Sequence, residues 1–465
     1  MNIRLEQHYT RLENDVETPI SHFIRHIGDE QGILFESAEV DGRWGRFSII
    51  AGDFLLTAAC RDGLLALDIR DPRLSPLAAL DGLPFVEGAR MLMRGLDIVP
   101  LLPDDVAVKD IPPISRSLCG YFGYGMAGVF EPKLARALPP EQAEACLALP
   151  GTVTLFDHVY NKVCRLSLIK ERPPHGPERA TASRPAGIGE IRSSMTREEF
   201  IRVVGEVQER LRQGEGMQVV PSVGFSAPFE GDPFTLYRRL RRVNPSPYLF
   251  YMNLPGLTLM GSSPEVMVGC SAGHLRISPI AGTRPRGETA REDNLFEEEL
   301  VRDPKEQAEH VMLVDLARND LGKVAAPGTV TLGRYMEVER FSHVMHLTSY
   351  ITAHLAPGMD AFDILAAAFP AGTVSGAPKI RAMEIIAGAE PAPRGPYAGA
   401  IGWLGLDRDS VSMDTGITIR SLWIRDGTAH WQAGAGIVLD SVPETEWQEC
   451  ANKAAAMKSV MACNA

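Results

Sequence analysis

Short runs of strand-forming residues dominate the first third of the chain. GRFSIIAG (45–52) and GTVTLFDHVYNKVCRLSLI (151–169) are the clearest, and the second is nearly continuous in β-formers. Runs of this kind are typical of β-strands. The following stretch, RPPHGPERATASRPAGIGE (172–190), is rich in Pro, Gly, Ser and Arg and has no hydrophobic period. It favours a linker or an exposed loop, so we expect one region at 1–190, interleaved with a second at 191–465.

Helical patterns appear in the second region. Thr196 and Glu199 have the spacing of a capping box, which predicts a helix continuing through 200–211. Asp303 and Pro304 suit a helix cap and a first helical position, and EQAEHVMLVDLARND continues helically. A third helix is expected after the sequence Asp-Ser-Val-Pro near the C-terminus. The mixture of helices and strands predicts an α+β or α/β fold with large antiparallel sheets, without fixing the topology.

Composition and charge exclude several functions. The 465 residues carry a formal net charge of −12, so the chain has no general attraction for nucleic acid or anionic membranes. No run of 18 apolar residues occurs, and the polar start has no apolar signal region, which favours a cytoplasmic protein. The seven cysteines are scattered and form no C-x-x-C pair, so neither a disulfide framework nor a zinc knuckle fits.

Two of the predicted helices place carboxylates three residues apart on one face. Glu306 and Glu309 lie on the first, and Glu446 and Glu449 on the second. Brought together, these faces would form a carboxylate cage that suits Mg²⁺, a hard cation that prefers oxygen ligands. The same spacing is common on solvated helix faces, so the pattern alone leaves both readings open.

Glycine-rich turns and histidines provide further candidate binding and catalytic residues. PIAGTRPRG (279–287), PAGTVSGAPK (370–379) and WQAGAGIV (431–438) combine small and polar residues, as backbone sites for anions do, although each also suits a structural turn. None matches a nucleotide-binding glycine motif. His343 and His346 would face opposite sides of a predicted strand, and a structural or a catalytic role stays open for each. Nucleophilic hydrolysis has little support, because there is no G-x-S-x-G motif.

Taken together, these segments resemble the chorismate-utilising enzyme family, and within it the anthranilate synthase component I branch. ILFESAE and RFSIIAG resemble the N-terminal part of the branch more weakly. The family-ordered segments are GEGMQVVPS, NPSPYLFY, GSSPEV, PIAGTRPRG, DPKEQAEHVMLVDLARNDLG, ERFSHVMH, PAGTVSGAPKIRAMEII, RGPYAGAIGW and GAGIVLDSVPETEWQECANKA.

The resemblance implies an α+β fold in which two facing antiparallel β-sheets are flanked by helices, with the active site in the cleft between them. It implies chorismate as substrate and Mg²⁺ held by Glu309 and Glu449, with Glu306 and Glu446 supporting them. Glu265 resembles the general acid that protonates the departing C4 hydroxyl, and His346 the histidine that assists the second step. The implied substrate contacts are Ala281, Gly282, Thr283, Thr373, Tyr397, Arg420, Gly434, Ala435, Gly436 and Lys453.

Two positions distinguish the activities of close relatives. Gln218 stands where isochorismate-forming relatives carry a water-activating lysine. Ala281 stands where 4-amino-4-deoxychorismate synthases commonly carry a lysine that adds to C2 of the ring. A methyl group is no nucleophile and leaves room for ammonia, so we expect conversion of chorismate and ammonia to anthranilate and pyruvate. The alternatives are the two aminodeoxychorismate-type synthases and a non-catalytic tryptophan-binding subunit.

The resemblance also implies a partner and an inhibitor. No glutamine amidotransferase segment is recognisable, so a separate glutamine amidotransferase subunit is expected to supply ammonia. Tryptophan is expected to bind and inhibit, although Leu249 stands where methionine is usual and Met217 where an aromatic residue is usual. The matching tryptophan-binding positions are Glu36, Ser37, Asn244, Pro245, Ser246, Pro247, Tyr248 and Leu249.

Overall fold

The computed structural model describes the whole chain except residues 1, 14–15, 37–44, 170–186, 341–343 and 463–465. The predicted turn-rich stretch at 172–190 therefore lies mostly outside the described residues, as do Ser37 and His343. No described helix is long and apolar enough to cross a membrane. The six cysteines within the described part of the chain are all free thiols.

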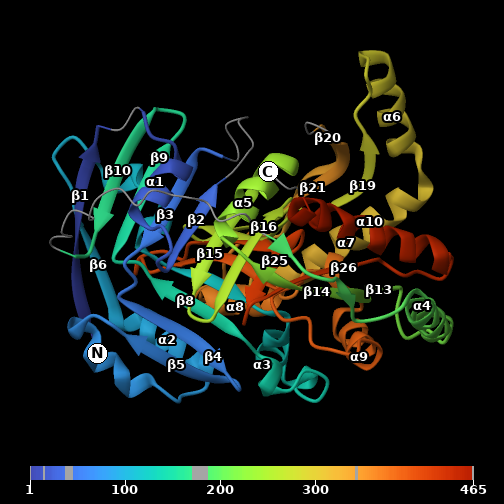
Figure 1. Cartoon of the computed structure of the whole chain (residues 1–465), viewed down its shortest axis with the longest axis horizontal. Coiled ribbons are helices and arrows are strands. Elements are labelled where there is room, and N and C mark those ends of the chain that lie inside the picture. The colour runs from blue at the N-terminus through green and yellow to red at the C-terminus, as the bar shows by residue number, and fades with distance from the viewer. Residues whose placement is uncertain (1, 14–15, 37–44, 170–186, 341–343, 463–465) are drawn as a thin grey trace.

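The fold is α+β and is built on two large sheets (Figure 1). The first sheet has 13 strands, and its order along the sheet is β11 (Gly187–Ile188), β14 (Ser222–Glu230), β26 (Thr428–Gly434), β25 (Ser421–Arg425), β16 (Leu257–Ser263), β15 (Tyr248–Leu254), β2 (Gly32–Glu36), β3 (Phe47–Gly52), β9 (Thr152–Asp157), β10 (Lys162–Ser167), β1 (Ile3–Leu12) and β6 (Leu96–Leu101), with β12 (Arg192–Ser193) also paired to β14. The pairs are antiparallel except for β1 with β6, which is parallel.

The second sheet has 11 strands. Its order is β19 (Ile280–Pro285), β21 (Val344–His354), β18 (His274–Ile277), β17 (Val266–Ser271), β24 (Met413–Ile417), β23 (Ala400–Gly405), β7 (Ser117–Phe122), β8 (Ala145–Leu149), β4 (Leu56–Arg61) and β5 (Leu64–Ile69), with β20 (Thr331–Arg340) also paired to β21. A separate short pair joins β13 (Gln218–Val219) to β22 (Gly376–Ala377). Strands from both sides of residue 190 take part in both large sheets, so the two regions are interleaved rather than side by side.

The run at 151–169, which is rich in β-forming residues, forms a hairpin of two strands. β9 and β10 pair antiparallel across a turn that includes Asn161, whose φ of 48° is left-handed. The Asp157 carboxylate accepts hydrogen bonds from the backbone amides of Val159 and Tyr160 at 3.1 and 3.2 Å, which holds the turn. Asn is one of the few non-glycine residues that readily adopt this conformation, so the turn is encoded without Gly or Pro.

The predicted helix starts are confirmed. Thr196 and Glu199 close a capping box at 2.7 and 3.2 Å, and Asp303 accepts from the amides of Lys305 and Glu306 at 3.0 and 3.3 Å. The helices are α1 (Pro19–His26), α2 (Phe85–Gly95), α3 (Ala127–Phe130), α4 (Arg197–Arg212), α5 (Pro233–Val243), α6 (Ala290–Arg302), α7 (Pro304–Gly322), α8 (Ala361–Ala368), α9 (Lys379–Ala389) and α10 (Pro443–Ala462).

The core and the charges define where a site can lie. The largest hydrophobic cluster takes side chains from both large sheets, such as Ile33 of β2 and Leu118 of β7.

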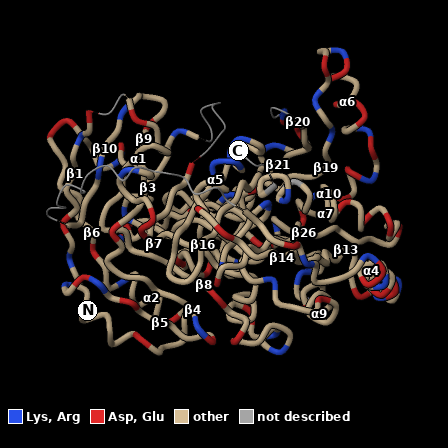
Figure 2. The backbone as a smooth tube through the Cα atoms, in the orientation of Figure 1, with Lys and Arg blue, Asp and Glu red and all other residues tan. Residues whose placement is uncertain are grey.

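Figure 1 shows α6, α7 and α10 at one end of the molecule, away from the N-terminal strands. Figure 2 shows that α4 carries both signs of charge along its length, as expected of a solvated helix. The acidic helices α7 and α10 are therefore not the only ones rich in carboxylates.

Candidate active site

Glu265 lies in the link between β16 and β17, in a largely desolvated position. Its backbone carbonyl accepts a hydrogen bond from Ile417 of β24 at 3.0 Å, which fixes the link. The Thr373 hydroxyl, from the short 3₁₀ turn Gly372–Val374, donates to Glu265 Oε1 at 2.9 Å. Burial raises the pKa of Glu265 to about 7, although the Thr373 hydrogen bond and the charge of Arg420 both lower it. A carboxyl group of this kind is partly protonated near neutral pH and can donate a proton.

Arg420 lies between β24 and β25 with an exposed side chain. Its φ of 48° is left-handed, an uncommon and strained conformation for an arginine. The backbone amide of Ser262, on β16, donates to the Arg420 carbonyl at 3.1 Å and holds the bend. A cationic, solvent-facing group is thus kept close enough to Glu265 to affect its pKa. This places a positive charge beside a proton donor, as an anionic substrate requires.

His346 is oriented from the neighbouring strand β19. Its Nδ1 lies 2.8 Å from the Gly282 carbonyl oxygen and 3.1 Å from Thr283 Oγ1. A carbonyl only accepts, so Nδ1 carries the proton and the lone pair is on Nε2. Burial lowers the pKa of His346, although the Gly282 carbonyl opposes this, so the ring is neutral near pH 7.

Only glycine fits at position 282. Its φ is +66°, and a Cβ there would approach Leu300 Cδ1 to 2.7 Å and Glu306 Oε2 to 3.1 Å. Ala281, next to it on β19, is buried and pairs with Leu347 of β21. Gly282 therefore lies between His346, which hydrogen-bonds to its carbonyl oxygen, and Glu306 on the acidic face of α7.

Four carboxylates from α7 and α10 form an acidic group. Burial raises the pKa of Glu309, and the charges of Glu306 and Glu449 raise it further, while a hydrogen bond from Gln218 opposes them. Burial also raises the pKa of Glu446, assisted by the charge of Glu449. The charge of Glu449 on α10 raises the pKa of both Glu309 and Glu446, so these carboxylates lie near one another, while Lys305 opposes the rise and Lys453 pairs with Glu449. The predicted convergence of the two helices is present.

The donor set suits Mg²⁺, because all four groups offer carboxylate oxygens. Among the described residues, no three of these carboxylates bring ligand atoms within 4.8 Å of one another, so their oxygens are spaced more widely than the ligands of one bound ion. Glu206 and Glu209 on α4 have the same spacing but are both exposed, and Glu209 pairs with Arg212 and Gln213. Glu306, Glu309 and Glu446 are less exposed than this α4 pair, whereas Glu449 is exposed and pairs with Lys453 at 2.6 Å.

A tighter group elsewhere does not suit a cation. Glu17, His22 and His26 bring ligand atoms within 4.8 Å of one another. Burial and the charge of Arg165 lower the pKa of His22 to about 4, and Arg25 already pairs with Glu17. This environment disfavours added positive charge.

The remaining predicted contacts border the acidic group. Gln218 is buried on β13, with its amide nitrogen 2.7 Å from where a Cβ on Gly436 would lie. Lys453 of α10 is exposed and donates to the Gly434 carbonyl at 3.0 Å and to Glu449 at 2.6 Å. Tyr397 is buried, and its hydroxyl hydrogen-bonds to the backbone of Gly434. Ala435, between the two glycines, is fully buried.

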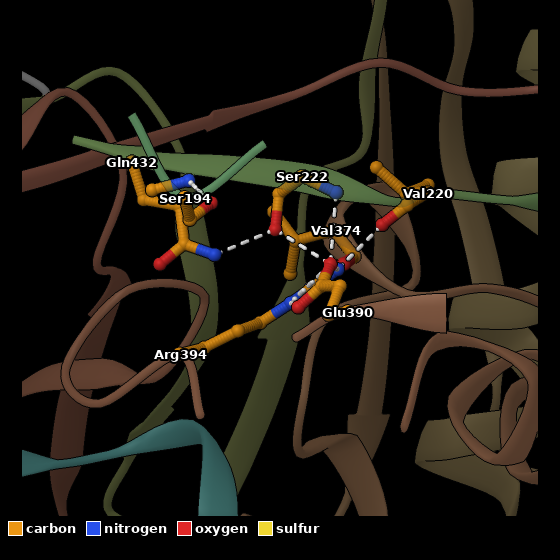
Figure 3. Close-up of polar contacts among 8 residues, drawn as sticks. Ser194, Val220, Ser222, Val374, Glu390, Arg394 and Gln432 are labelled. Atoms are coloured by element: carbon orange, nitrogen blue, oxygen red, sulfur yellow. Dashed lines mark hydrogen bonds and ion pairs between the residues drawn. The ribbon is translucent and has the colours of Figure 1, made fainter. Parts of the chain in front are cut away.

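A buried ion pair that the sequence analysis missed holds these segments together (Figure 3). Glu390 accepts from Arg394 at 2.6 Å, and these side chains are only 5% and 1% exposed. Arg394 also donates to the carbonyls of Val374 and Val220 at 2.8 and 2.6 Å, next to Thr373 and close to Gln218 along the chain. Both residues lie in a segment without hydrophobic periodicity, so the sequence pattern does not predict their burial. Arg394 is the arginine of RGPY, the one member of the pair that lies in a segment singled out by the sequence.

The predicted tryptophan segments lie together. Leu249 of β15 is directly opposite Glu36 of β2, whose carboxylate accepts from Tyr237 at 2.7 Å and pairs with Arg241 at 3.0 Å. The Asn244 carbonyl accepts a hydrogen bond from the Ser262 hydroxyl. Ser246 is buried, Pro245 is exposed and Pro247 is intermediate, while Tyr248 donates to Asp414 at 2.9 Å.

Comparison with known proteins identifies the family of the chain. The profile of the chorismate binding enzyme family matches residues 99–459. Anthranilate synthase component 1 of Aquifex aeolicus is 38% identical, with 97% of this chain and 93% of the relative covered. The same component of Thermus thermophilus is 38% identical, with 95% of each chain covered.

Solved structures show the same relationship. Anthranilate synthase component I from Streptococcus pneumoniae matches with a TM-score of 0.71 and 30% identity, over 96% of this chain and 98% of that one. The menaquinone-specific isochorismate synthase MenF of Escherichia coli matches with a TM-score of 0.70 at 19% identity, over 99% and 95%, which shows a shared fold. The chain therefore belongs to the chorismate binding enzyme family and, within it, to the group of anthranilate synthase component I proteins.

Proposed function

We propose that this chain converts chorismate and ammonia into anthranilate and pyruvate in a Mg²⁺-dependent reaction, the first step of tryptophan biosynthesis. The observation that carries the proposal is Glu265, a carboxyl group with a pKa of about 7 that lies beside Arg420 and accepts a hydrogen bond from Thr373. Hydroxide is a poor leaving group, so a proton donor at this position suits the loss of the C4 hydroxyl.

The first step adds ammonia at C2. The nitrogen lone pair forms the C2–N bond, the ring double bonds shift, and the C4–O bond breaks as Glu265 gives its proton to the departing oxygen. Ala281 offers no amine that could add to C2 in place of ammonia. Gln218 offers no basic amine for water, which disfavours isochorismate formation. The product of this step is 2-amino-2-deoxyisochorismate.

The second step removes the C2 proton and expels pyruvate, and aromatisation drives it. His346 is proposed to assist here, since its ring is neutral and its proton is fixed on Nδ1 by Gly282. The substrate carboxylates are proposed to contact Arg420, Lys453 and the backbone around Gly434 and Gly436, with Tyr397, Thr283 and Thr373 completing the cleft.

Mg²⁺ is proposed to be held by Glu309 and Glu449, with Glu306 and Glu446 supporting them. The raised pKa values of Glu309 and Glu446, to which neighbouring carboxylates contribute, support the assignment, because a divalent cation would relieve the repulsion. When bound, the ion supplies positive charge that an acidic protein needs in order to hold a doubly negative substrate.

Ammonia is proposed to come from a separate glutamine amidotransferase subunit, in line with the name component 1 carried by the relatives. Tryptophan is proposed to bind near Glu36 and Asn244 and to inhibit. The Ser262 hydroxyl contacts the Asn244 carbonyl, and its backbone amide holds Arg420, so this residue offers a short route between the two sites. As a biosynthetic enzyme, the chain is proposed to work in the cytoplasm.

The proposal is tested by mixing the purified chain with chorismate, Mg²⁺ and ammonium, and following anthranilate fluorescence and pyruvate release together. We expect both signals to rise at equal rates, and neither to rise in Glu265→Gln. Amine incorporation without pyruvate would instead identify an aminodeoxychorismate-type synthase. No turnover at all would identify a non-catalytic subunit.

A further inference from the structure

A small cavity lies behind Glu265 and Thr373, between the second sheet and α7. It measures about 30 Å³, and its walls include Glu265, Ser278, Leu313, Ala317, Asp320 and Thr373. Of the described residues, neither His346 nor Arg420 nor the four carboxylates of the acidic group are among those that line it. Glu265 and Thr373 line this cavity, which we call the back pocket, and they are the members of the proposed active site that it reaches.

One wall of the back pocket offers an unused hydroxyl group. Ser278 follows β18 directly and is 7% exposed, and its Oγ meets no hydrogen-bond partner among the described residues. Buried hydroxyl groups in proteins nearly always have a partner, often an ordered water. A cavity holds a water when it exceeds roughly 10–15 Å³ and offers two or more polar partners. The back pocket exceeds this volume, and Ser278 and Glu265 are polar residues on its wall.

The other polar wall leads toward solvent. Asp320 is buried and pairs with Lys379 at 2.7 Å and with Lys323 at 3.0 Å. The Lys323 side chain is half exposed. Asp320 therefore links the wall of the back pocket to the half-exposed Lys323, while most of the other lining residues are apolar.

We propose that the back pocket binds a water molecule between Glu265 and Ser278 and returns a proton to Glu265 after each turnover. The inference rests on the proposed function, in which Glu265 gives its proton to the C4 oxygen as the C4–O bond breaks and water leaves with the bonding electron pair. Glu265 is then a carboxylate. It regains a proton from the pocket water, which takes one from solvent along the Asp320 side.

The geometry explains why this route is needed. The side of Glu265 toward Arg420 is proposed to face the substrate, which would occupy that side during turnover. A carboxyl group that ionises near pH 7 has no large excess of the protonated form, and its recovery depends on a nearby proton source. Glu265 also lines the back pocket, which offers a second approach to this residue.

The test compares Ser278→Ala and Ser278→Val with the wild type at saturating and limiting chorismate. Recovery of the proton follows the first irreversible step, so kcat should fall about tenfold or more while kcat/KM for chorismate stays unchanged. The solvent deuterium isotope effect on kcat should rise. Ser278→Thr, which keeps the hydroxyl, should retain most activity, and Ser48→Ala, at a buried serine of β3 that bonds His158 at 2.7 Å, should behave as the wild type.

A crystal structure of the wild-type chain provides the second readout. We expect an ordered water within hydrogen-bond distance of both Ser278 Oγ and the Glu265 carboxylate. A dry back pocket, an unchanged kcat in both variants, or a parallel fall of kcat and kcat/KM would overturn the proposal. If Ser278→Val does not fold, Ser278→Ala and the wild-type structure still decide. Failure of the proposed function appears separately, as absence of anthranilate from the wild type.

Discussion

The Thr373 hydroxyl donates to Glu265 Oε1 across 2.9 Å, joining two segments that are 108 positions apart in the chain. A hydroxyl that donates to a carboxylate stabilises its ionised form, so this contact limits how far burial raises the pKa of Glu265. Burial and the Thr373 hydrogen bond thus shift the pKa of Glu265 in opposite directions.

Thr373→Val should raise the pKa of Glu265 above about 7, since the hydrogen bond to the ionised form is lost. Glu265 works in its protonated form, so the basic limb of the profile of kcat/KM against pH should move to higher pH. The profile is measured at constant free ammonia concentration, with Thr373→Ser as the matched control that keeps the hydroxyl. A basic limb that stays in place, or moves down, contradicts the assignment.

Glu309→Gln and Glu449→Gln should each lower Mg²⁺-dependent turnover by at least about 100-fold, because each removes a carboxylate proposed to hold the ion. Turnover against Mg²⁺ concentration, together with calorimetric Mg²⁺ binding, measures the effect. Glu206→Gln and Glu209→Gln are matched controls with the same spacing on the exposed face of α4, and should leave both quantities unchanged. Wild-type Mg²⁺ dependence in either α7 or α10 variant would rule out that ligand.

His346→Met should slow pyruvate loss more than ammonia addition, so 2-amino-2-deoxyisochorismate should accumulate. Rapid quenching and chromatography of the reaction mixture detect the intermediate. Equal slowing of both steps would count against a role for His346 in the second step.

Glu390→Gln leaves Arg394 charged and buried, and should lower the free energy of unfolding by about 3–5 kcal/mol. Denaturant titration measures this free energy of unfolding. The exposed pair of Glu209 and Arg212, whose side chains are 58% and 57% exposed, provides the control: Glu209→Gln should change the same quantity by about 0–1 kcal/mol. Equal effects in the two variants would show that the buried pair does not stabilise the loop that carries Thr373.

The sequence predicts local structure here better than long-range contacts. The start of α7 follows from Asp303 and Pro304, because caps depend on residues only a few positions apart. The convergence of Glu309 with Glu449 depends on how two helices pack, and no local pattern encodes it. Their expected roles come from resemblance to a family, and the raised pKa of Glu309, to which burial and the charges of Glu306 and Glu449 contribute, is new information from the structure.

The features that the sequence does not reveal have physical reasons. The run at 151–169 reads as nearly continuous because its turn has no Gly or Pro, yet Asn161 reverses the chain. Arg394 and Glu390 stand in a loop region where hydrophobic periodicity says nothing about burial. The back pocket lies between segments around Ser278, Asp320 and Thr373, and a cavity between distant segments leaves no sequence signal.

The central claim is that Glu265 and the acidic group serve amination of chorismate followed by loss of pyruvate. The most direct measurement is mass spectrometry of the products formed by the purified chain from chorismate, Mg²⁺ and nitrogen-15 ammonium. We predict anthranilate carrying the heavy nitrogen and an equal amount of pyruvate. An aminated cyclohexadiene that accumulates without pyruvate, or unreacted chorismate with no labelled product, would contradict the account.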